Sequence, residues 1–510
     1  MRTLQNPSFT KTNVILMGSL LLSACGGSSN NDTTAPSISN VTPYNSDVML
    51  SRKVIVNGEA ADNKELKSVV ISHGEQLIDA DLDQGKFVAT LEATAGNNFY
   101  KVIATDTSGN EAISEANFYY GSQATAGGAH SAIIKDGKIY AWGRNNKGQA
   151  GIGTITKISD DPETAAAVHP ITPTLISDVS SIKFVSLAFN QNASSALDAN
   201  GYVWSWGDGD DGQLGLGIAN DNVIDETDYT SPQKIQNLTD IVAINRGYDH
   251  MLLLKNDGSV LAFGKNKNGQ LGDGTAENSD TPVSVQGLTN IVQISAAVSS
   301  YALDKEGRLW AWGSNNYGQL GQGISDSNVH STPVEVVFDE PVISIASGKG
   351  HALALTESGK VYAWGLNASS QVGMRPRDTS TIDQPWENFV LTPKRLPGLN
   401  DAIAIWANGN QSFVKRADGK IYPWGQNMLG TLGIEEDGNV IEPVSPILEL
   451  DNVVDLGNGA LHTLAIRNDN TLFAWGWSFE GSLGGGKDLL NAWTYRLPLT
   501  ISTDTSLTVK

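Results

Sequence analysis

The sequence lacks features that mark several common classes of protein. Its 510 residues include one cysteine, Cys25, so no disulfide can form within the chain. Lys and Arg number 34 against 55 for Asp and Glu, and the net charge of -21 repels phosphate backbones, which disfavours nucleic-acid binding. Neither a zinc-protease motif nor a nucleophile elbow occurs. These absences predict a protein that binds rather than catalyses, with no metal ion and no cofactor.

Runs of helix-forming residues are also scarce, whereas glycine occurs 53 times and hydrophobic residues make up 40% of the chain. Short strands joined by glycine turns fit this mixture better than helices do. A chain of this length exceeds what one ordinary core organises, so we expect two or more domains. The composition therefore predicts an all-β protein.

The N-terminal residues have the character of an export signal. Arg2 and Lys11 supply a positively charged region before the apolar segment 13–22, which is too short to span a membrane comfortably. The sequence Leu22-Ser-Ala-Cys25 follows, and it resembles the lipobox of bacterial lipoproteins. The resemblance implies removal of residues 1–24 as a signal peptide and acylation of Cys25, by palmitate among other chains, which anchors the protein in a membrane. The alternative is an ordinary secretory signal with a cysteine there by coincidence.

Residues 25–34 are expected to be the lipidated cysteine and a flexible tether, because residues 26–34 include no apolar side chain. Gly26, rather than Asp, follows the cysteine, which resembles outer-membrane sorting in Gram-negative lipoproteins. We therefore expect a lipid-anchored protein of the cell envelope, held at the outer membrane if the source is Gram-negative.

Residues 35–120 alternate apolar and polar positions in several short stretches. They predict strands at 53–56, 68–71, 86–91 and 99–104, separated by turn sequences. Asp32-Thr-Thr-Ala-Pro36 and the stretch 104–110 resemble parts of bacterial immunoglobulin-like domains, which implies a β-sandwich. Three residues offer oxygen atoms that suit calcium, although such residues more often cap turns. They are Asp62, Asn63 and Asp106.

From residue 121 to residue 510 one phrase recurs seven times. Arg308–Gly321 reads RLWAWGSNNYGQLG, a strand that ends in Trp-Gly, followed by a Gly-Gln-Leu-Gly tail. Long repeats with strand chemistry predict propeller blades of four strands each. The aromatic residue before the glycine is Trp142, Trp206, Phe263, Trp312, Trp364, Trp424 or Trp475.

We interpret the phrase as structural. A tryptophan provides a large apolar surface and an indole N–H that needs a partner. Gly313 permits a positive φ or a close approach of backbone, Asn315 can tie its own turn, and Gln319 with Leu320 can bridge neighbouring blades.

The phrase is similar to the repeat of the regulator of chromosome condensation (RCC1) family, and the similarity covers residues 121–510. This family folds as a seven-bladed β-propeller, so the resemblance implies the same fold behind an N-terminal immunoglobulin-like sandwich. The copies of the phrase are not identical, since Phe263 replaces Trp in the third copy and Thr431 replaces Gln in the sixth copy. We expect the tail after Pro498, with residues 506–509, to add a strand that closes the ring against the first blade.

Two other patterns have a chemical and a structural interpretation. His130, His250, His351 and His462 share one position in the repeat, and a ring of imidazoles could bind metal. A shared position is itself a structural explanation, because the same turn needs the same hydrogen bond. The sequence 207–212, GDGDDG, matches a glycine-rich nucleotide loop, but no helix follows and its three carboxylates would repel a pyrophosphate. The same carboxylates, Asp208, Asp210 and Asp211, also suit calcium in part.

The connections after the Gly-Gln-Leu-Gly tails differ in length, and the long ones belong to the first, second and fifth repeats. Equivalent loops of a propeller lie on one face, so these insertions should build one rim. Aromatic and arginine side chains in them suit a partner interface. The predicted partner-binding residues are Tyr229, Arg375, Arg377, Trp386 and Phe389.

These observations favour a membrane-anchored, exported scaffold whose propeller binds a protein or glycan partner, with no enzymatic activity. The RCC1 resemblance implies one alternative, a guanine-nucleotide exchange factor for a small GTPase, although a lipobox argues against a cytosolic partner. The same resemblance implies a second alternative, a secreted enzyme inhibitor, since a propeller of this family blocks β-lactamases. A hydrolase or lyase would need a carboxylate cleft that the sequence does not reveal. The fold alone does not choose among these functions.

Overall fold

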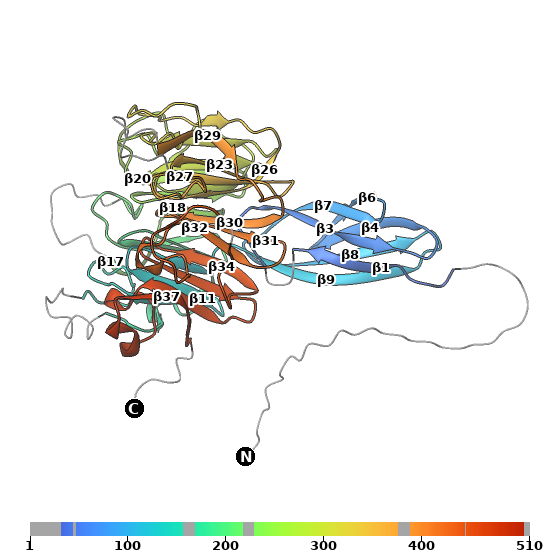
Figure 1. The fold of residues 1–510 in the computed structure, drawn as a ribbon, viewed down its shortest axis with the longest axis horizontal. Coiled ribbons are helices and arrows are strands. Elements are labelled where there is room, and N and C mark those ends of the chain that lie inside the picture. Colours follow the sequence, from blue (N-terminus) through green and yellow to red (C-terminus); the bar gives the residue numbers. More distant parts are fainter. Residues whose placement is uncertain are drawn as a thin grey trace, which may run out of the picture.

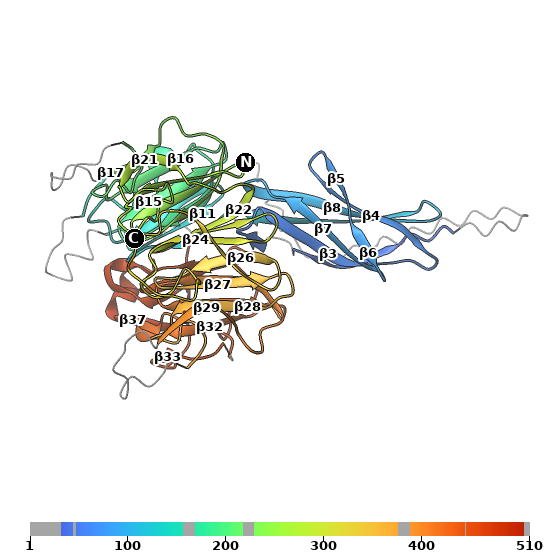
Figure 2. The same ribbon diagram turned by 90° about the horizontal axis from the view of Figure 1, so that it is seen from above.

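The computed structural model describes residues 32–43, 47–156, 169–217, 229–375, 388–443 and 445–503. Cys25, Arg377 and Trp386 therefore lie outside the described residues. Figure 1 shows an elongated N-terminal sandwich that projects from one side of a larger β-propeller, and Figure 2 shows the same two parts from above. No helix in the described part of the chain is both long and apolar enough to cross a lipid bilayer.

Two sheets form the sandwich, with strand orders β1-β3-β7-β6 and β2-β9-β8-β4-β5. Its strands are β1 Ser37–Thr42, β2 Asp47–Met49, β3 Lys53–Ala61, β4 Leu66–His73, β5 Gln76–Asp79, β6 Asp81–Asp83, β7 Lys86–Glu92, β8 Gly96–Asp106 and β9 Glu111–Tyr120. Strands β3, β4, β7 and β8 contain the four predicted segments. Alternate residues of β7 are buried, as expected for a strand with one face on a core, and that core includes Val54, Phe87 and Val102. Membership of the bacterial immunoglobulin-like class stays a prediction.

The propeller consists of four-stranded sheets, here called blades and numbered in chain order, each built from four consecutive strands. Blades 1 to 4 contain β10 Ala124–Ala126, β11 His130–Lys135, β12 Lys138–Gly143, β13 Thr174–Leu175; β14 Phe184–Phe189, β15 Ala193–Asp198, β16 Val203–Gly207, β17 Tyr229–Lys234; β18 Ile241–Arg246, β19 His250–Lys255, β20 Val260–Gly264, β21 Ser279–Ser284; and β22 Ile291–Ala296, β23 Ser299–Asp304, β24 Leu309–Gly313, β25 Val334–Val336.

Blades 5 to 7 contain β26 Val342–Ser347, β27 His351–Thr356, β28 Val361–Leu366, β29 Phe389–Arg395; β30 Ala402–Asn408, β31 Gln411–Arg416, β32 Ile421–Gln426, β33 Asn439–Val440; and β34 Val453–Asn458, β35 His462–Arg467, β36 Leu472–Trp477, β37 Thr494–Ile501. Short 3-10 helices occur at η1 Ser177–Val179, η4 Met428–Gly430, η5 Phe479–Gly481 and η6 Lys487–Asn491.

The first strand of each blade contacts the first strand of the next, and β34 of blade 7 contacts β10 of blade 1. The expectation about the C-terminal tail is wrong for the part of it that the structure describes. Strand β37 pairs with β36 inside blade 7, whereas blade 1 takes its first strand, β10, from the segment that directly follows the sandwich. The chain can make this closure without the tail because the sandwich delivers β10 to the ring. Residues 506–509 lie outside the described residues.

The repeated tryptophan joins neighbouring blades. Trp312 is fully buried, and its indole N–H donates to the main-chain carbonyl of Gln270 in the preceding blade at 2.9 Å. Ser300 Oγ donates to the same carbonyl at 2.7 Å and lies 2.8 Å from Nε2 of His250. The same three contacts recur at the junctions of blades 1 with 2, 5 with 6 and 7 with 1, through His130, His351 and His462.

This network accounts for the shared histidines. Each serine hydroxyl donates its hydrogen to the carbonyl, so each histidine donates from Nε2, and burial keeps the ring neutral. Burial lowers the pKa of His130, His250 and His351 to about 3, and that of His462 to about 4. Each ring lies at a different blade junction, and each Nε2 is engaged by a serine. The geometry therefore supports the structural interpretation of the histidines rather than one shared metal site.

The junction of blades 2 and 3 departs from this pattern in three places at once. Ala193 replaces the histidine, Met251 replaces the serine and Phe263 replaces the tryptophan. Arg246 fills the gap, because its Nη1 donates to the Gln213 carbonyl at 2.8 Å, where an indole N–H would otherwise bind. Its Nη2 donates to Ser195 Oγ, and burial lowers the pKa of this arginine to about 9, so it still carries its charge at neutral pH. One guanidinium therefore replaces the donors of two side chains.

The glycine after each aromatic residue has the two properties that the repeat predicts. Gly365 has a φ of +96°, and a Cβ placed on it would lie 2.3 Å from the carbonyl oxygen of Gly350. Any other residue would clash with this neighbouring backbone.

We expect Arg246→Ala to lower the free energy of unfolding by about 1–3 kcal/mol, because the Gln213 carbonyl loses its donor. Adding Phe263→Trp to that variant should recover about 1 kcal/mol by supplying an indole N–H. Trp312→Ala, which removes the larger buried side chain at an ordinary junction, should cost about 3–5 kcal/mol. Chemical denaturation measures all three. Equal stabilities of Arg246→Ala and the wild type would show that the guanidinium does not replace the indole.

Candidate functional site

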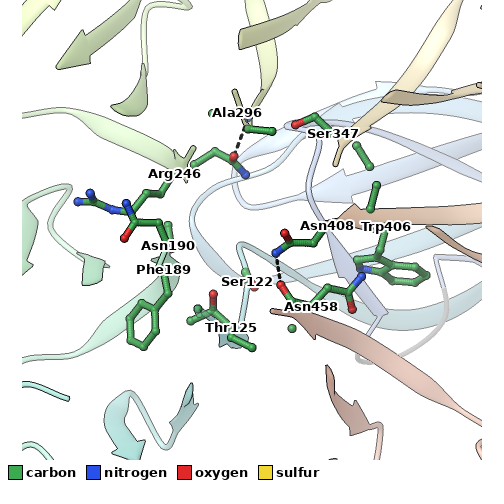
Figure 3. A pocket seen from close by; sticks show the side chains of 18 of the residues that line it. Ser122, Thr125, Phe189, Asn190, Arg246, Ala296, Ser347, Trp406, Asn408 and Asn458 are labelled. Carbon is green, nitrogen blue, oxygen red and sulfur yellow. Dashed lines mark hydrogen bonds between the residues drawn. The ribbon is translucent and has the colours of Figure 1, made fainter. Parts of the chain in front are cut away.

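A cavity of about 620 Å³ lies on the axis of the propeller, lined by the first strands of all the described blades. Figure 3 shows side chains from separate blades around this space, among them Thr125, Asn190, Arg246 and Asn408. The first strand of each blade thus has two functions, since it packs on its neighbours and supplies the cavity wall. Sequence reasoning missed these residues, although their fixed place about four residues before the shared histidine position could have indicated them.

The sandwich covers one end of the cavity. Leu50 and the segment 120–122, which belong to the sandwich and the link that follows it, line the cavity together with the blades. Contacts with several blades hold the sandwich there. The Arg52 N–H donates to the Val292 carbonyl at 2.8 Å, and Tyr119 Oη donates to the Val185 carbonyl at 2.9 Å.

Asp455 fastens the link to blade 7. Its Oδ2 accepts hydrogen bonds from the main-chain N–H of Gln123 at 2.7 Å, from that of Ala124 at 3.0 Å and from Ser122 Oγ at 3.3 Å. Burial raises the pKa of this carboxyl to about 6 despite these donors. A single side chain on β34 therefore fixes the turn between the sandwich and β10.

The opposite end of the cavity is bounded by the hairpins that join the first and second strands of the blades. Gln191 and Lys349 are exposed there, and Tyr248 is half-buried. Arg144, Gln426 and Trp477, which follow the repeat glycine in blades 1, 6 and 7, also line the cavity. We call this the open end. It offers hydrogen-bonding amides, a phenol and an indole, a combination suited to binding a polar partner.

A sequence profile of the RCC1-like domain matches residues 94–385 and 223–506. The Arabidopsis thaliana ultraviolet-B receptor UVR8 is 30% identical over 378 residues, which cover 72% of this chain and 79% of UVR8. This protein belongs to the RCC1-like domain family. The resemblance expected from the repeats is thereby confirmed.

Other members of the RCC1-like family match less of their own length. Protein pim1 of Schizosaccharomyces pombe is 30% identical, over 59% of this chain and 58% of pim1. The human E3 ubiquitin-protein ligase HERC2 is 28% identical over 72% of this chain, which corresponds to 7% of HERC2.

Solved structures show the same RCC1-like fold. Yeast RCC1 (Prp20), crystallised with Kap60, superposes with a TM-score of 0.61 at 22% identity and covers 75% of this chain and 86% of its own. Human WBSCR16 superposes with a TM-score of 0.59 at 21% identity, covering 72% and 95%.

Three of the predicted partner-binding residues lie within the described part of this RCC1-like propeller. Tyr229 is half-buried and packs with the core between blades 1 and 2, and Phe389 is half-buried with its ring 5.4 Å from that of Tyr317. Arg375 is exposed. Tyr229 and Phe389 thus contribute to packing, and a role for any of the five residues in binding stays a prediction.

The acidic loop after β16 is engaged by lysines of the neighbouring blades. Lys147 Nζ lies 3.8 Å from Asp210 Oδ2, and Lys265 Nζ lies 3.1 Å from Asp211 Oδ2. Burial raises the pKa of the third carboxyl, that of Asp208. Asp210 and Asp211 thus bridge neighbouring blades, and calcium binding by this loop stays a prediction.

A second acidic cluster lies at the end of the sandwich away from the propeller. Carboxylate oxygens of Asp32, Asp62 and Asp106 lie within 4.8 Å of one another. Asp32 and Asp62 each have one buried oxygen, Oδ2 and Oδ1 respectively, that accepts no hydrogen bond in the described structure, although Lys64 Nζ lies 3.8 Å from Asp32 Oδ2. Hard oxygen ligands of this kind suit calcium.

The turn-capping interpretation holds for the same residues. Asp62 Oδ2 accepts from the N–H of Lys64, and Asp106 Oδ1 accepts from the N–H of Ser108. The predicted ligand Asn63 donates its amide N–H to Asp32 Oδ1 at 3.3 Å, so in this arrangement its nitrogen rather than its oxygen faces the cluster.

We expect calcium at millimolar concentration to raise the melting temperature of the full chain, because a cation would relieve the repulsion among three carboxylates. Asp62→Asn should remove this shift, whereas Asp81→Asn, on an exposed strand of the same sandwich, should keep it. Calorimetry in calcium and in a chelator measures the effect. Identical melting curves under the two conditions would contradict calcium binding.

Proposed function

We propose that this protein is a non-catalytic binding scaffold, exported and anchored to a membrane through Cys25, that engages its partner at the open end of the cavity. In this proposal the blades form one closed, seven-bladed ring, and an immunoglobulin-like sandwich spaces that ring from the lipid. The asymmetry of the cavity supports the proposal most directly. Since the sandwich covers one end, a partner on the propeller axis can approach only from the other.

The chemistry of the open end is consistent with binding. Hairpin tips from different blades converge there, so a single partner can touch several blades at once, and each contact is held by a rigid strand. The side chains of the open end include aromatic residues and Arg144, and aromatic residues and arginine are enriched in protein interfaces.

The relatives support a binding or regulatory role in general terms. Prp20p of Saccharomyces cerevisiae, another solved structure of this fold, binds Gsp1p and histones. A role as an exchange factor for a small GTPase is therefore the alternative with the most support from the family. The inhibitor alternative would use the same open end against an enzyme.

Photo-crosslinking in cells that make the full-length protein tests the binding face. A photoreactive residue at Tyr248 or Lys349, on the open end, should form a discrete crosslinked species. The same residue at Leu77, which is 72% exposed on the sandwich, is the matched control and should not form that species. Crosslinks to one partner from Leu77 alone would place the binding face on the sandwich and overturn the proposal.

The anchor is tested separately. Metabolic labelling with a fatty acid should mark the wild type and leave Cys25→Ala unlabelled, and the variant should be lost from the membrane fraction, because the acyl chains supply the affinity for lipid. An unlabelled wild type in the cytosol would remove the lipoprotein proposal and favour the exchange-factor alternative.

A further inference from the structure

Three aromatic side chains form a continuous row beside the open end, on blade 7. The ring centroids of Trp477 and Phe479 are 5.2 Å apart with an interplanar angle of 31°, and those of Phe479 and Trp493 are 5.9 Å apart at 21°. Trp477 lines the cavity. The aromatic row therefore runs from the cavity mouth outward over the surface of the propeller.

The outer end of the aromatic row is unusually open to solvent. Trp493 is 75% exposed and Phe479 is 37% exposed, whereas the tryptophans of the repeat are fully buried. An exposed tryptophan gains little from the hydrophobic effect, so packing of the propeller does not explain its position.

Contacts from two directions hold the row in place. The main-chain N–H of Ser478 donates to the Trp493 carbonyl at 3.0 Å. Glu480, next to Phe479, accepts from Arg144 Nε of blade 1 at 2.5 Å. Since Phe479 also stacks against Trp493, the exposed indole is supported from behind. A surface prepared in this way loses little conformational entropy when a ligand stacks on it.

Polar groups flank the inner end of the row. Gln426 of blade 6 and Arg144 of blade 1 line the cavity on either side of Trp477 in the blade order. Arg144 is paired with Glu480, so the inner end of the row carries little net charge, whereas the charges of Arg246 and Lys349, unpaired within the described part of the chain, line the cavity elsewhere. The row itself is therefore compatible with a neutral ligand, and the net charge of -21 on the whole chain opposes the approach of an acidic one.

We infer that the aromatic row and the open end together bind a neutral oligosaccharide built of pyranose units with equatorial substituents. The faces of such sugars present C–H groups, which are attracted to the negative face of an aromatic ring. Their hydroxyl groups need hydrogen-bonding partners at the edge, and Gln426, Tyr248 and Arg144 provide donors there. This inference rests on the proposed function, since it names the chemical class of the partner at the open end.

Titration calorimetry on the purified full chain tests the inference, with chitohexaose and cellohexaose as probes and an oligogalacturonate as the acidic comparison. At least one neutral probe should bind, and more tightly than the acidic one. Trp493→Ala should weaken this binding by about tenfold, as expected for loss of one stacking interaction, and Trp493→Phe should retain part of it. Phe99→Ala removes an aromatic side chain that is 67% exposed on the sandwich, so it is the matched control and should bind as the wild type does.

The high exposure of Trp493 means that its replacement should leave the melting temperature unchanged, so loss of binding cannot be assigned to unfolding. Absence of binding by both neutral probes would overturn the inference, as would equal affinities of Trp493→Ala and the wild type. A protein crosslinked at Tyr248 together with no oligosaccharide binding would overturn this inference and leave the proposed function standing. If oligosaccharide bound equally well to Trp493→Ala and no crosslink formed from the open end, both this inference and the proposed function would be overturned.

Discussion

The blades of the propeller are held together by buried main-chain carbonyls, each of which accepts hydrogen bonds from side chains of the next blade. At Gln270 the carbonyl accepts hydrogen bonds from the indole of Trp312 and the hydroxyl of Ser300, both in the following blade, and the hydroxyl also contacts His250, which belongs to the same blade as Gln270. All these groups are buried, so an unpaired member would be costly. The contact between His462 and Ser131 repeats this arrangement between the last blade and the first. Loss of one blade would therefore leave unpaired polar groups on both of its neighbours.

The way in which the ring closes also determines which face of the propeller is covered and which stays accessible. The chain enters blade 1 directly from the sandwich, and Asp455 fixes that entry from blade 7. The sandwich is consequently held against the ring where the first and last blades meet, and contacts such as that of Arg52 with Val292 extend its hold to blade 4. One face is occupied by the protein's own N-terminal part, and the other retains the cavity mouth and the aromatic row.

The sequence predicts the parts of this structure that the repeat encodes. The phrase around Trp312 and Gly313 indicates strands, a buried indole and a positive φ, and the structure places both residues accordingly. It does not reveal how Arg246 replaces the indole at Phe263, because that exchange depends on a residue outside the phrase. The contacts of Asp32 and Asp455 escape prediction for a related reason. Asp32 meets Asp62 and Asp106, and Asp455 meets Gln123, only because the fold brings distant parts of the chain together, and no local pattern marks these contacts.

The described chain begins at Asp32, at the end of the sandwich that lies away from the propeller. The described chain enters the sandwich at the end remote from the propeller, and the sandwich lies between that point and the ring (Figure 1). Hydrogen bonds from Tyr119 and Arg52 to the blades hold the sandwich against the ring, so the two parts form one continuous body. The cavity mouth therefore lies at the opposite end of the molecule from the point where the described chain begins. A partner that occupies the cavity mouth is consequently separated from Asp32 by the length of the sandwich as well as by the depth of the ring.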